Sequence, residues 1–145
     1  MVAELYTKEI LLLAGRISHI GRLKNPHSSA EKHSRLCGSS IVVDICVTDN
    51  IITDFSQEIA SCILGQASAS IVGEHIIGLS VEEFWQVKAT VDAMLKKKTA
   101  PPVGAFSVFQ ELTGAYLYKN RHEAIMLVFH AIEECLKKLG YENHL

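Results

Sequence analysis

The sequence predicts an α+β fold in which a small antiparallel β-sheet packs against several α-helices. Residues 39–48 and 51–60 alternate apolar and polar side chains, as half-buried strands do. The segments before and after them carry apolar residues at the spacing of amphipathic helices. The order along the chain is therefore a helix, a hairpin and then several helices, which favours the α+β class.

Length and composition predict one globular domain over residues 1–145, with a single buried core. Hydrophobic residues make up 48% of the chain and charged residues 21%, which is typical of a compact protein. The net charge is −2 with no basic stripe, so nucleic acid is not an expected partner. No apolar run approaches the roughly 20 residues that span a bilayer, so no membrane partner is expected. Without a recognisable secretion signal, we expect a cytoplasmic protein.

The first helix is expected over residues 3–17, where apolar residues alternate with charged ones at helical spacing. The polar residues 25–30 contain Asn25-Pro26 and are typical of a loop. Helices are also expected over residues 63–72, 106–112 and 120–139. Another should begin at the capping-box pattern from Ser80 to Glu83 and run to about residue 98.

The turn at residues 48–50 leaves two registers open for the strand pair. A two-residue loop at Asp49-Asn50 would place the apolar side of one strand against the polar side of the other. Slipping the pairing by one residue sets Val43 opposite Phe55 and brings both apolar sets to one face. We therefore predict the second register.

Extended to the open end of the hairpin, this register places Cys37 opposite Ser61, next to Cys62. The same extrapolation puts Cys46 on the other face, roughly 30 Å from Cys37. Cys135 lies on the apolar stripe of the last helix and is expected to be a core residue. The informative pair is therefore Cys37 and Cys62.

These two thiols suggest a soft-metal or sulfur-handling site. Cys62 precedes an expected helix start, where unpaired N–H groups stabilise a thiolate. Cys37 is followed by Gly38, where the backbone can bend around a bound atom. Four cysteines without a secretion signal indicate a reducing compartment, in which thiols commonly bind metal or react. The alternative is that both cysteines are small buried hydrophobic residues.

Two thiolates do not complete a tetrahedral site, so further ligands must come from elsewhere in the chain. His122 and Glu123 open the last helix and are candidates for a nitrogen and an oxygen ligand. The alternative is that they cap the helix or are solvated.

Several motifs occur in order along roughly residues 1–140. They are Asn25-Pro26, Ser34-Arg35-Leu36-Cys37-Gly38, Ile52-Thr53-Asp54-Phe55 and Ser61-Cys62-Ile63-Leu64-Gly65-Gln66-Ala67-Ser68-Ala69-Ser70. Together they resemble the iron–sulfur cluster assembly scaffolds of the IscU/NifU N-terminal family, and residues 96–114 resemble the insertion of its SufU-like branch.

The chain departs from that family's pattern at two positions. Ser39 stands where the family has an aspartate after Cys-Gly, and Ala124 stands where it has a third cysteine, in the frame Cys-x-x-Leu set by Leu127. Alanine cannot bind a metal, and a serine hydroxyl is a poor ligand for a soft one. His122 and Glu123 adjoin Ala124 and are the candidates to compensate.

The resemblance implies a non-enzymatic iron–sulfur cluster assembly protein. Cys37 and Cys62 would bind iron or a transient iron–sulfur cluster, with His122 and Glu123 completing the metal site. Sulfur would come from a cysteine desulfurase, and the product would pass to apo iron–sulfur proteins.

Two alternatives remain at this point. One is a zinc-binding adaptor that accepts sulfur from a cysteine desulfurase on Cys37 or Cys62. The other is a degenerate relative that binds no metal and acts only through protein contacts. A thiol–disulfide enzyme is disfavoured because the sequence contains no Cys-x-x-Cys motif.

Overall fold

The computed structural model describes residues 5–36 and 38–145. Its helices, strands and 3₁₀ helices (η) follow in chain order: α2 (Lys8–Ala14), β1 (Ser28–His33), β2 (Ser40–Thr48), β3 (Ile51–Ala60), α3 (Ile63–His75), α4 (Val81–Lys97), η1 (Gly104–Leu117), η2 (Lys119–Arg121) and α5 (His122–Lys138). Within this described part of the chain, no helix is both long and apolar enough to cross a membrane.

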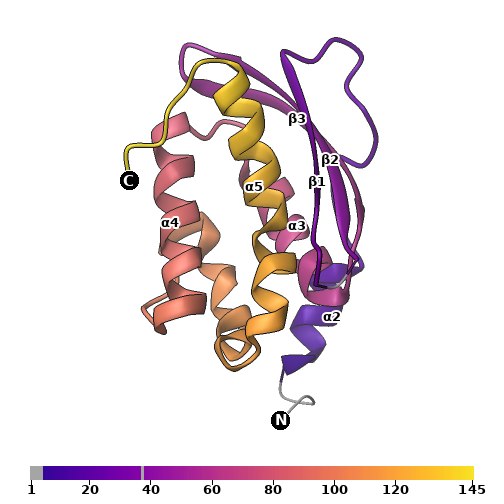
Figure 1. Cartoon of the computed structure of the whole chain (residues 1–145), viewed down its shortest axis with the longest axis vertical. Helices are drawn as coiled ribbons and strands as arrows, with labels where there is room; N and C mark the ends of the chain where they lie inside the picture. Colours follow the sequence, from indigo (N-terminus) through magenta and orange to yellow (C-terminus); the bar gives the residue numbers. More distant parts are fainter. Residues whose placement is uncertain (1–4, 37) are drawn as a thin grey trace.

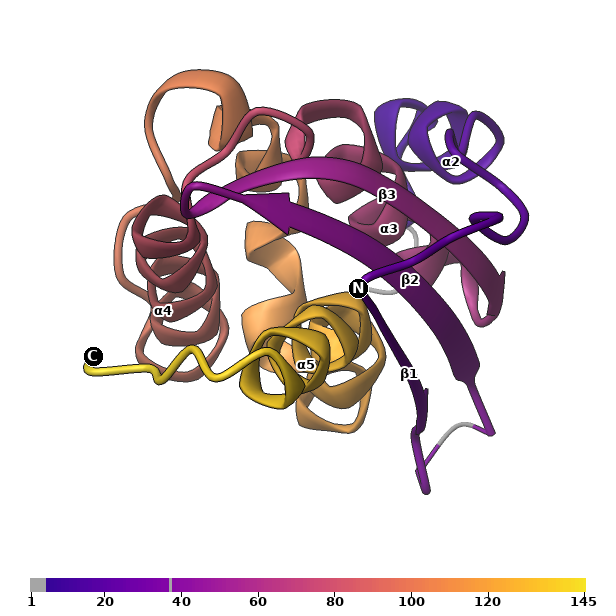
Figure 2. The same ribbon diagram turned by 90° about the horizontal axis from the view of Figure 1, so that it is seen from above.

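A three-stranded antiparallel sheet with the order β1-β2-β3 forms one side of the molecule (Figure 1). Helix α5 packs against β1 and β2, and α3 packs against β3. Seen from above, α5 lies between α4 and β1 (Figure 2). The arrangement confirms the predicted α+β fold, with a small antiparallel sheet covered by helices.

Strand β1 begins within the segment for which the sequence predicts a loop, so that prediction is wrong for residues 28–30 and confirmed for residues 25–27. The strand pairs with β2 from Ser28↔Ile45 to His33↔Ser40. As an edge strand it buries few side chains, among them Ser28 and Ala30. Edge strands are commonly short and polar, and here the pairing partner β2 supplies the order that the sequence of β1 does not signal.

The turn between β2 and β3 is the two-residue loop that the sequence argument rejected. Asp49 and Asn50 have φ of 52° and 63°, as a type I′ turn requires, and both residue types tolerate this region. Thr48 accordingly pairs with Ile51.

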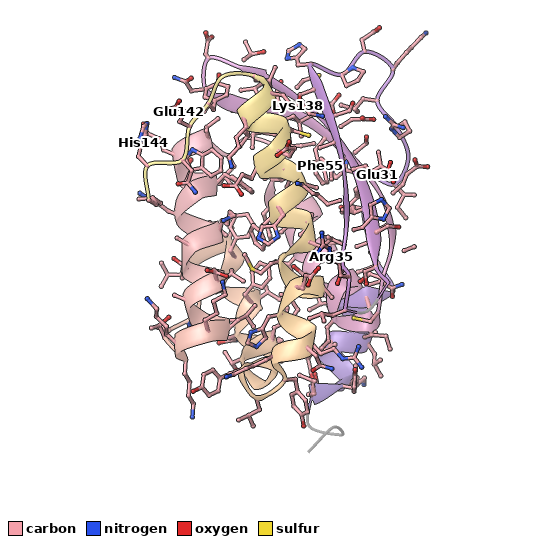
Figure 3. The ribbon with its side chains drawn as sticks, viewed as in Figure 1. Glu31, Arg35, Phe55, Lys138, Glu142 and His144 are labelled. Atoms are coloured by element: carbon pink, nitrogen blue, oxygen red, sulfur yellow. The ribbon has the colours of Figure 1, made fainter. Side chains whose placement is uncertain are left out.

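A bulge between Cys46 and Val47 resolves the mismatch that this turn would otherwise cause. It inserts one residue into β3, so that Ile45 pairs with Phe55. The predicted partner of Phe55, Val43, is therefore wrong by two residues. The prediction that both apolar sets share one face is confirmed for Phe55 and Ile59, which pair with Ile45 and Ile41 (Figure 3 labels Phe55). It is wrong for Ile51, which pairs with Thr48 on the other face, while the buried Ile52 lies opposite Val47.

The helix ends follow local capping rules. Helix α2 begins after Thr7, whose hydroxyl accepts a hydrogen bond from the Ile10 N–H at 3.2 Å, and it ends at Gly15. It is thus shorter than the predicted 3–17, of which residues 3 and 4 lie outside the described part. Helix α4 opens with the predicted capping box between Ser80 and Glu83.

The helix predicted over residues 106–112 is a 3₁₀ helix and extends over Gly104–Leu117. Its buried residues recur every third position, which matches the three residues per turn of this helix type. They are Phe106, Phe109, Leu112 and Ala115.

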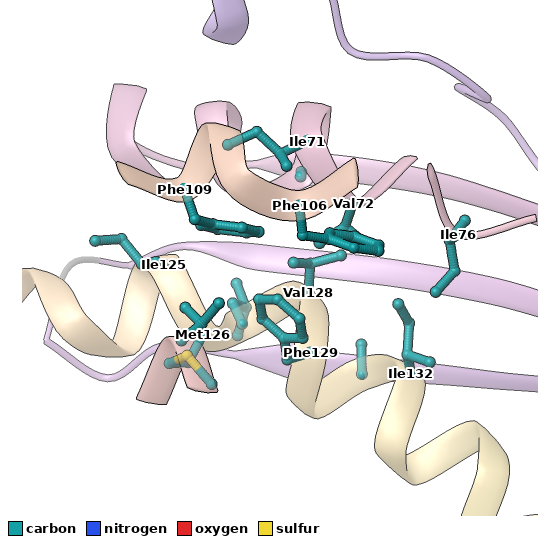
Figure 4. Packing of buried hydrophobic residues seen from close by; sticks show 14 of the residues in the cluster. Ile71, Val72, Ile76, Phe106, Phe109, Ile125, Met126, Val128, Phe129 and Ile132 are labelled. Atoms are coloured by element: carbon teal, nitrogen blue, oxygen red, sulfur yellow. The ribbon is translucent and has the colours of Figure 1, made fainter. Parts of the chain in front are cut away.

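The core lies between the sheet, α3, η1 and α5 (Figure 4). Ring centroids of Phe109 on η1 and Phe129 on α5 are 5.6 Å apart. Ile71 and Val72 of α3 belong to the same buried cluster. Because α3 and α5 pack together in this core, the packing fixes the position of their N-termini relative to one another.

A buried carboxylate fastens the chain before β1 to the sheet. Asp44 of β2 is 0% exposed, and its oxygens accept hydrogen bonds from Arg22 Nε at 2.8 Å and the Leu23 N–H at 2.9 Å. The hydroxyls of Ser29 and Ser56 also donate to it. Burial alone would raise the pKa of Asp44, but these hydrogen bonds outweigh it and hold the pKa at about 2.

Replacing Asp44 by Asn should lower the free energy of unfolding at neutral pH by about 2 kcal/mol, because the amide is a weaker acceptor and Arg22 loses its counter-charge. The folded-state pKa is depressed, so this stabilisation is present above 3.8 and is lost as the pH falls towards 2.

Urea unfolding of the wild type and Asp44→Asn over a pH series tests this. The difference between the two proteins should shrink below about pH 4. Asp49→Asn, in the exposed turn, is the matched control and should change little at any pH. A difference that stays constant down to the lowest pH would contradict the argument.

Candidate metal and sulfur site

Cys62 lies where the sequence places it, at the start of α3. Its φ of −66° and ψ of 168° make it the N-cap residue. Its carbonyl accepts the first helical hydrogen bond, from the Gln66 N–H at 2.9 Å. The side chain is half-buried. A residue at this position lies at a helix N-terminus, where unpaired backbone N–H groups and the helix dipole favour a negatively charged group.

The second predicted ligand, Cys37, lies outside the described residues, but residues on both sides of it are described. The Ser34 N–H donates to the Ser39 carbonyl at 2.7 Å and closes the connection between β1 and β2. Gly38 has a φ of +67°, a region that glycine reaches without strain. Leu36 is 66% exposed.

Ser39 and Ser61 join this connection to the residue before Cys62. Their hydroxyl oxygens are 2.8 Å apart. The observed β2–β3 register ends at Ser40↔Ala60, and one further step sets Ser39 opposite Ser61. Ser61 therefore faces Ser39, and the predicted placement of Cys37 opposite Ser61 concerns a residue outside the described part of the chain. Ser39, which stands where the resemblance expects an aspartate, bonds to a neighbouring hydroxyl.

The start of α5 lies against the first turn of α3. A Cβ added at Gly65 would lie 3.1 Å from the Ala124 carbonyl oxygen and 2.0 Å from Ser61 Oγ. In the next turn, Ser68 Oγ donates to the Ile125 carbonyl at 2.7 Å. Ala124, the position of the expected third cysteine, is therefore held close to the helix turn that Cys62 begins.

His122 is the first residue of α5, and its Nε2 lies 2.8 Å from the Ala115 carbonyl oxygen. A carbonyl can only accept, so Nε2 carries the proton and the neutral ring has its lone pair on Nδ1. Metal-binding histidines commonly donate their other ring N–H to a carbonyl in this way. The hydrogen bond thus leaves His122 suited to bind a metal through Nδ1.

Glu123 contacts the connection between β1 and β2. Its Oε1 accepts a hydrogen bond from the Arg35 N–H at 2.9 Å. Leu36, His122 and Glu123 also line a cavity of about 570 Å³ between this connection, α4 and α5. The two candidate ligands on α5 therefore lie beside the segment that leads to Cys37.

No three His, Cys, Asp or Glu side chains within residues 5–36 and 38–145 form a group that could hold a metal. A complete metal site at Cys62 therefore needs at least one ligand other than the side chains of these described residues.

Cys46 and Cys135 have other environments. The Cys135 thiol is fully buried and lies 3.6 Å from the Val43 carbonyl oxygen. Burial raises the pKa of Cys135 to about 11, so it stays a neutral thiol, and its prediction as a core residue is confirmed. Cys46 Sγ lies 3.6 Å from the Asn25 carbonyl oxygen.

Comparison with known proteins places the chain in a family. The family model described as the NifU-like N terminal domain matches residues 5–105. The chain belongs to the NifU-like N-terminal family. The resemblance inferred from the cysteine motifs is thereby confirmed.

Known relatives match this NifU-like chain over nearly its whole length. It is 27% identical over 136 residues to the iron–sulfur cluster assembly scaffold protein IscU of Thermotoga maritima, covering 94% of this chain and 95% of that protein. The crystal structure of a nitrogen-fixing NifU-like protein (N-terminal) from Brucella abortus superposes with a TM-score of 0.93, at 34% identity over 96% of each chain. A putative cluster assembly scaffold for the SUF system from Fervidobacterium islandicum shares the fold, with a TM-score of 0.80 at 19% identity, covering 91% of this chain and 96% of that one.

Two contacts of the NifU-like site were missed at the sequence level: Ser39 with Ser61, and Arg35 with Glu123. Serines and surface charges carry no periodic signal that would reveal such pairs. The glycine in Cys-x-x-Gly does carry a signal, because glycine inside a helix is destabilising unless something approaches closely. At Gly65 that approach is made by Ser61 and Ala124.

Replacing Gly65 by Ala should lower the free energy of unfolding by about 1–3 kcal/mol, because the new methyl group has no space. Adding Ser61→Gly removes both side-chain atoms in its way, so Gly65→Ala should cost less in that background. Denaturant unfolding of the four proteins of this double-mutant cycle measures the coupling. Equal costs in both backgrounds would contradict the close approach.

Proposed function

We propose that this NifU-like chain is an iron–sulfur cluster assembly protein that binds iron or a nascent cluster at Cys37 and Cys62 and passes it to apo-proteins. The observation that carries the proposal is the meeting of three segments at one end of the fold. They are the N-cap of α3 at Cys62, the β1–β2 connection that contains Cys37, and the start of α5 at Ala124.

The residues at this end fit the chemistry of such a cargo. Thiolates are the preferred protein ligands of iron in clusters, and Cys62 lies half-buried at the N-cap of α3. His122 is the proposed third ligand, through Nδ1, because Nε2 donates to the Ala115 carbonyl. Glu123, the other α5 residue that the sequence suggested as a ligand, accepts a hydrogen bond from the Arg35 N–H.

The proposed role is non-enzymatic. A cysteine desulfurase would supply the sulfur, and apo iron–sulfur proteins would receive the product. The name of the Thermotoga maritima relative, an iron–sulfur cluster assembly scaffold protein, supports this role.

A second candidate is a zinc-binding adaptor that accepts sulfur from a desulfurase. Ser39 and Ala124 favour it, because a chain with fewer thiolates has fewer soft ligands for iron. Zinc accepts a mixed set of thiolates and imidazole.

Anaerobic reconstitution with ferrous iron and sulfide tests the first proposal. The wild type should develop visible cluster absorbance and bind iron, and Cys37→Ala, Cys62→Ala and His122→Ala should each lose most of both. Cys46→Ala is the matched control and should keep them, because its thiol lies against Asn25.

Metal analysis of the same samples separates the candidates. If the protein binds one zinc ion per chain and shows no cluster absorbance, the zinc-adaptor function is correct and the scaffold function is overturned. A wild type that binds neither iron nor zinc would overturn both, and would leave a role in protein contacts alone.

Replacing Ala124 by Cys should strengthen the site. Position 124 lies against the first turn of α3, and a cysteine there adds a thiolate to the two already proposed. We expect slower loss of the cluster to a chelator, by roughly tenfold, in line with what one metal-site contact contributes. Ala131→Cys, buried on the same helix and away from its start, is the control. Equal cluster lifetimes in both variants would contradict the proposed geometry.

A further inference from the structure

Glu123 has a contact that its proposed role as a ligand does not explain. Its Oε1 accepts a hydrogen bond from the backbone N–H of Arg35, 88 residues away in the sequence, at 2.9 Å. Arg35 precedes Cys37 by two residues. Figure 3 labels Arg35, which lies beside α5. The carboxylate therefore joins the start of α5 to the chain that leads into the cysteine turn.

We propose that Glu123 is a positioning residue, which holds the β1–β2 connection against α5, and that it is not a metal ligand. The inference rests on the proposed function and deepens it, because it assigns a role to a residue of the same site. The acceptor is a carboxylate and the donor a backbone amide, and because the bond is exposed to solvent we expect it to contribute about as much as an ordinary hydrogen bond.

The connection is held at two points that lie on opposite sides of Cys37 in the sequence. Before it, the Arg35 amide is held by Glu123 of α5. After it, the Ser39 hydroxyl is 2.8 Å from that of Ser61, the residue before Cys62. The Ser34–Ser39 backbone bond closes the segment between the two ties. These links fix the approach of the connection to both α5 and α3.

The position of Glu123 on its helix favours this role. It lies in the first turn of α5, where a carboxylate is stabilised by the helix dipole whether or not a metal is present. The neighbouring His122 is fixed by a different bond, to Ala115. The two residues therefore have different roles. His122 offers the lone pair of Nδ1 to a metal, and Glu123 orients the backbone of the β1–β2 connection at Arg35.

The test uses two substitutions that separate the charge of Glu123 from its hydrogen bond. Gln keeps an oxygen that can accept from Arg35 but is a poor metal ligand, whereas Ala removes both. Glu134→Ala is the matched control, because Glu134 is a half-buried glutamate of the same helix and pairs with Lys32. All four proteins are measured without metal and then with zinc as the probe.

Amide hydrogen exchange at Arg35 in the metal-free proteins reports directly on its hydrogen bond to Glu123. Exchange at Arg35 should rise roughly fivefold in Glu123→Ala, as for the loss of one ordinary hydrogen bond, and stay close to wild type in Glu123→Gln and Glu134→Ala. Unchanged exchange in Glu123→Ala would overturn the proposal, whatever the protein does with metals.

Zinc affinity, measured by competition with a chelator, distinguishes positioning from ligation. Glu123→Ala should weaken binding roughly tenfold, the usual cost of losing a residue that orients a ligand, and Glu123→Gln should bind as the wild type does. Equal loss in Gln and Ala would make Glu123 a ligand and overturn the inference. A wild type that binds no metal would refute the proposed function, while the exchange data would still decide whether Glu123 holds Arg35.

Discussion

The close approach of α3 and α5 is the constraint on which the rest of this site depends. At Gly65 there is no room for a side chain between Ser61 and the Ala124 carbonyl oxygen. In the next turn of α3, a buried hydrogen bond from the Ser68 hydroxyl to the Ile125 carbonyl fixes how α5 is rotated about its axis and how far it is shifted along α3. Small residues on α3 permit this distance, because larger ones would hold the two backbones apart.

From that contact, the positions of the remaining groups follow. Cys62 is the N-cap residue of α3. The first turn of α5 contains His122, Glu123 and Ala124. The sheet supplies the other side, because the β2–β3 register sets Ser39 beside Ser61. The site is therefore set by the pairing of two strands together with the packing of two helices, and each is stabilised by the core.

The sequence was sufficient for features that depend on periodicity and capping. Strands β2 and β3, the start of α3 at Cys62 and the capping box at Ser80 were predicted, because each leaves a local pattern. Strand β1 left none, since its partner β2 and not its own side chains gives it order. The register failed because the sequence gave no sign of the bulge after Cys46. Glu123 and Arg35 meet only through tertiary packing, which no local pattern encodes.

The two departures from the family pattern show that fold and ligand number are separable here. Ala124 fills the space against Gly65 with its backbone, so the packing of α3 on α5 does not need a larger side chain there. Ser39 replaces an ionised group by a hydroxyl that bonds to Ser61 and so keeps the end of the hairpin joined. The core nevertheless reaches this end of both helices, because Leu64 at the start of α3 and Ile125 at the start of α5 are fully buried. A chain of this family can therefore differ at two positions of the pattern while keeping the packing of α3 on α5 and the contact between Ser39 and Ser61.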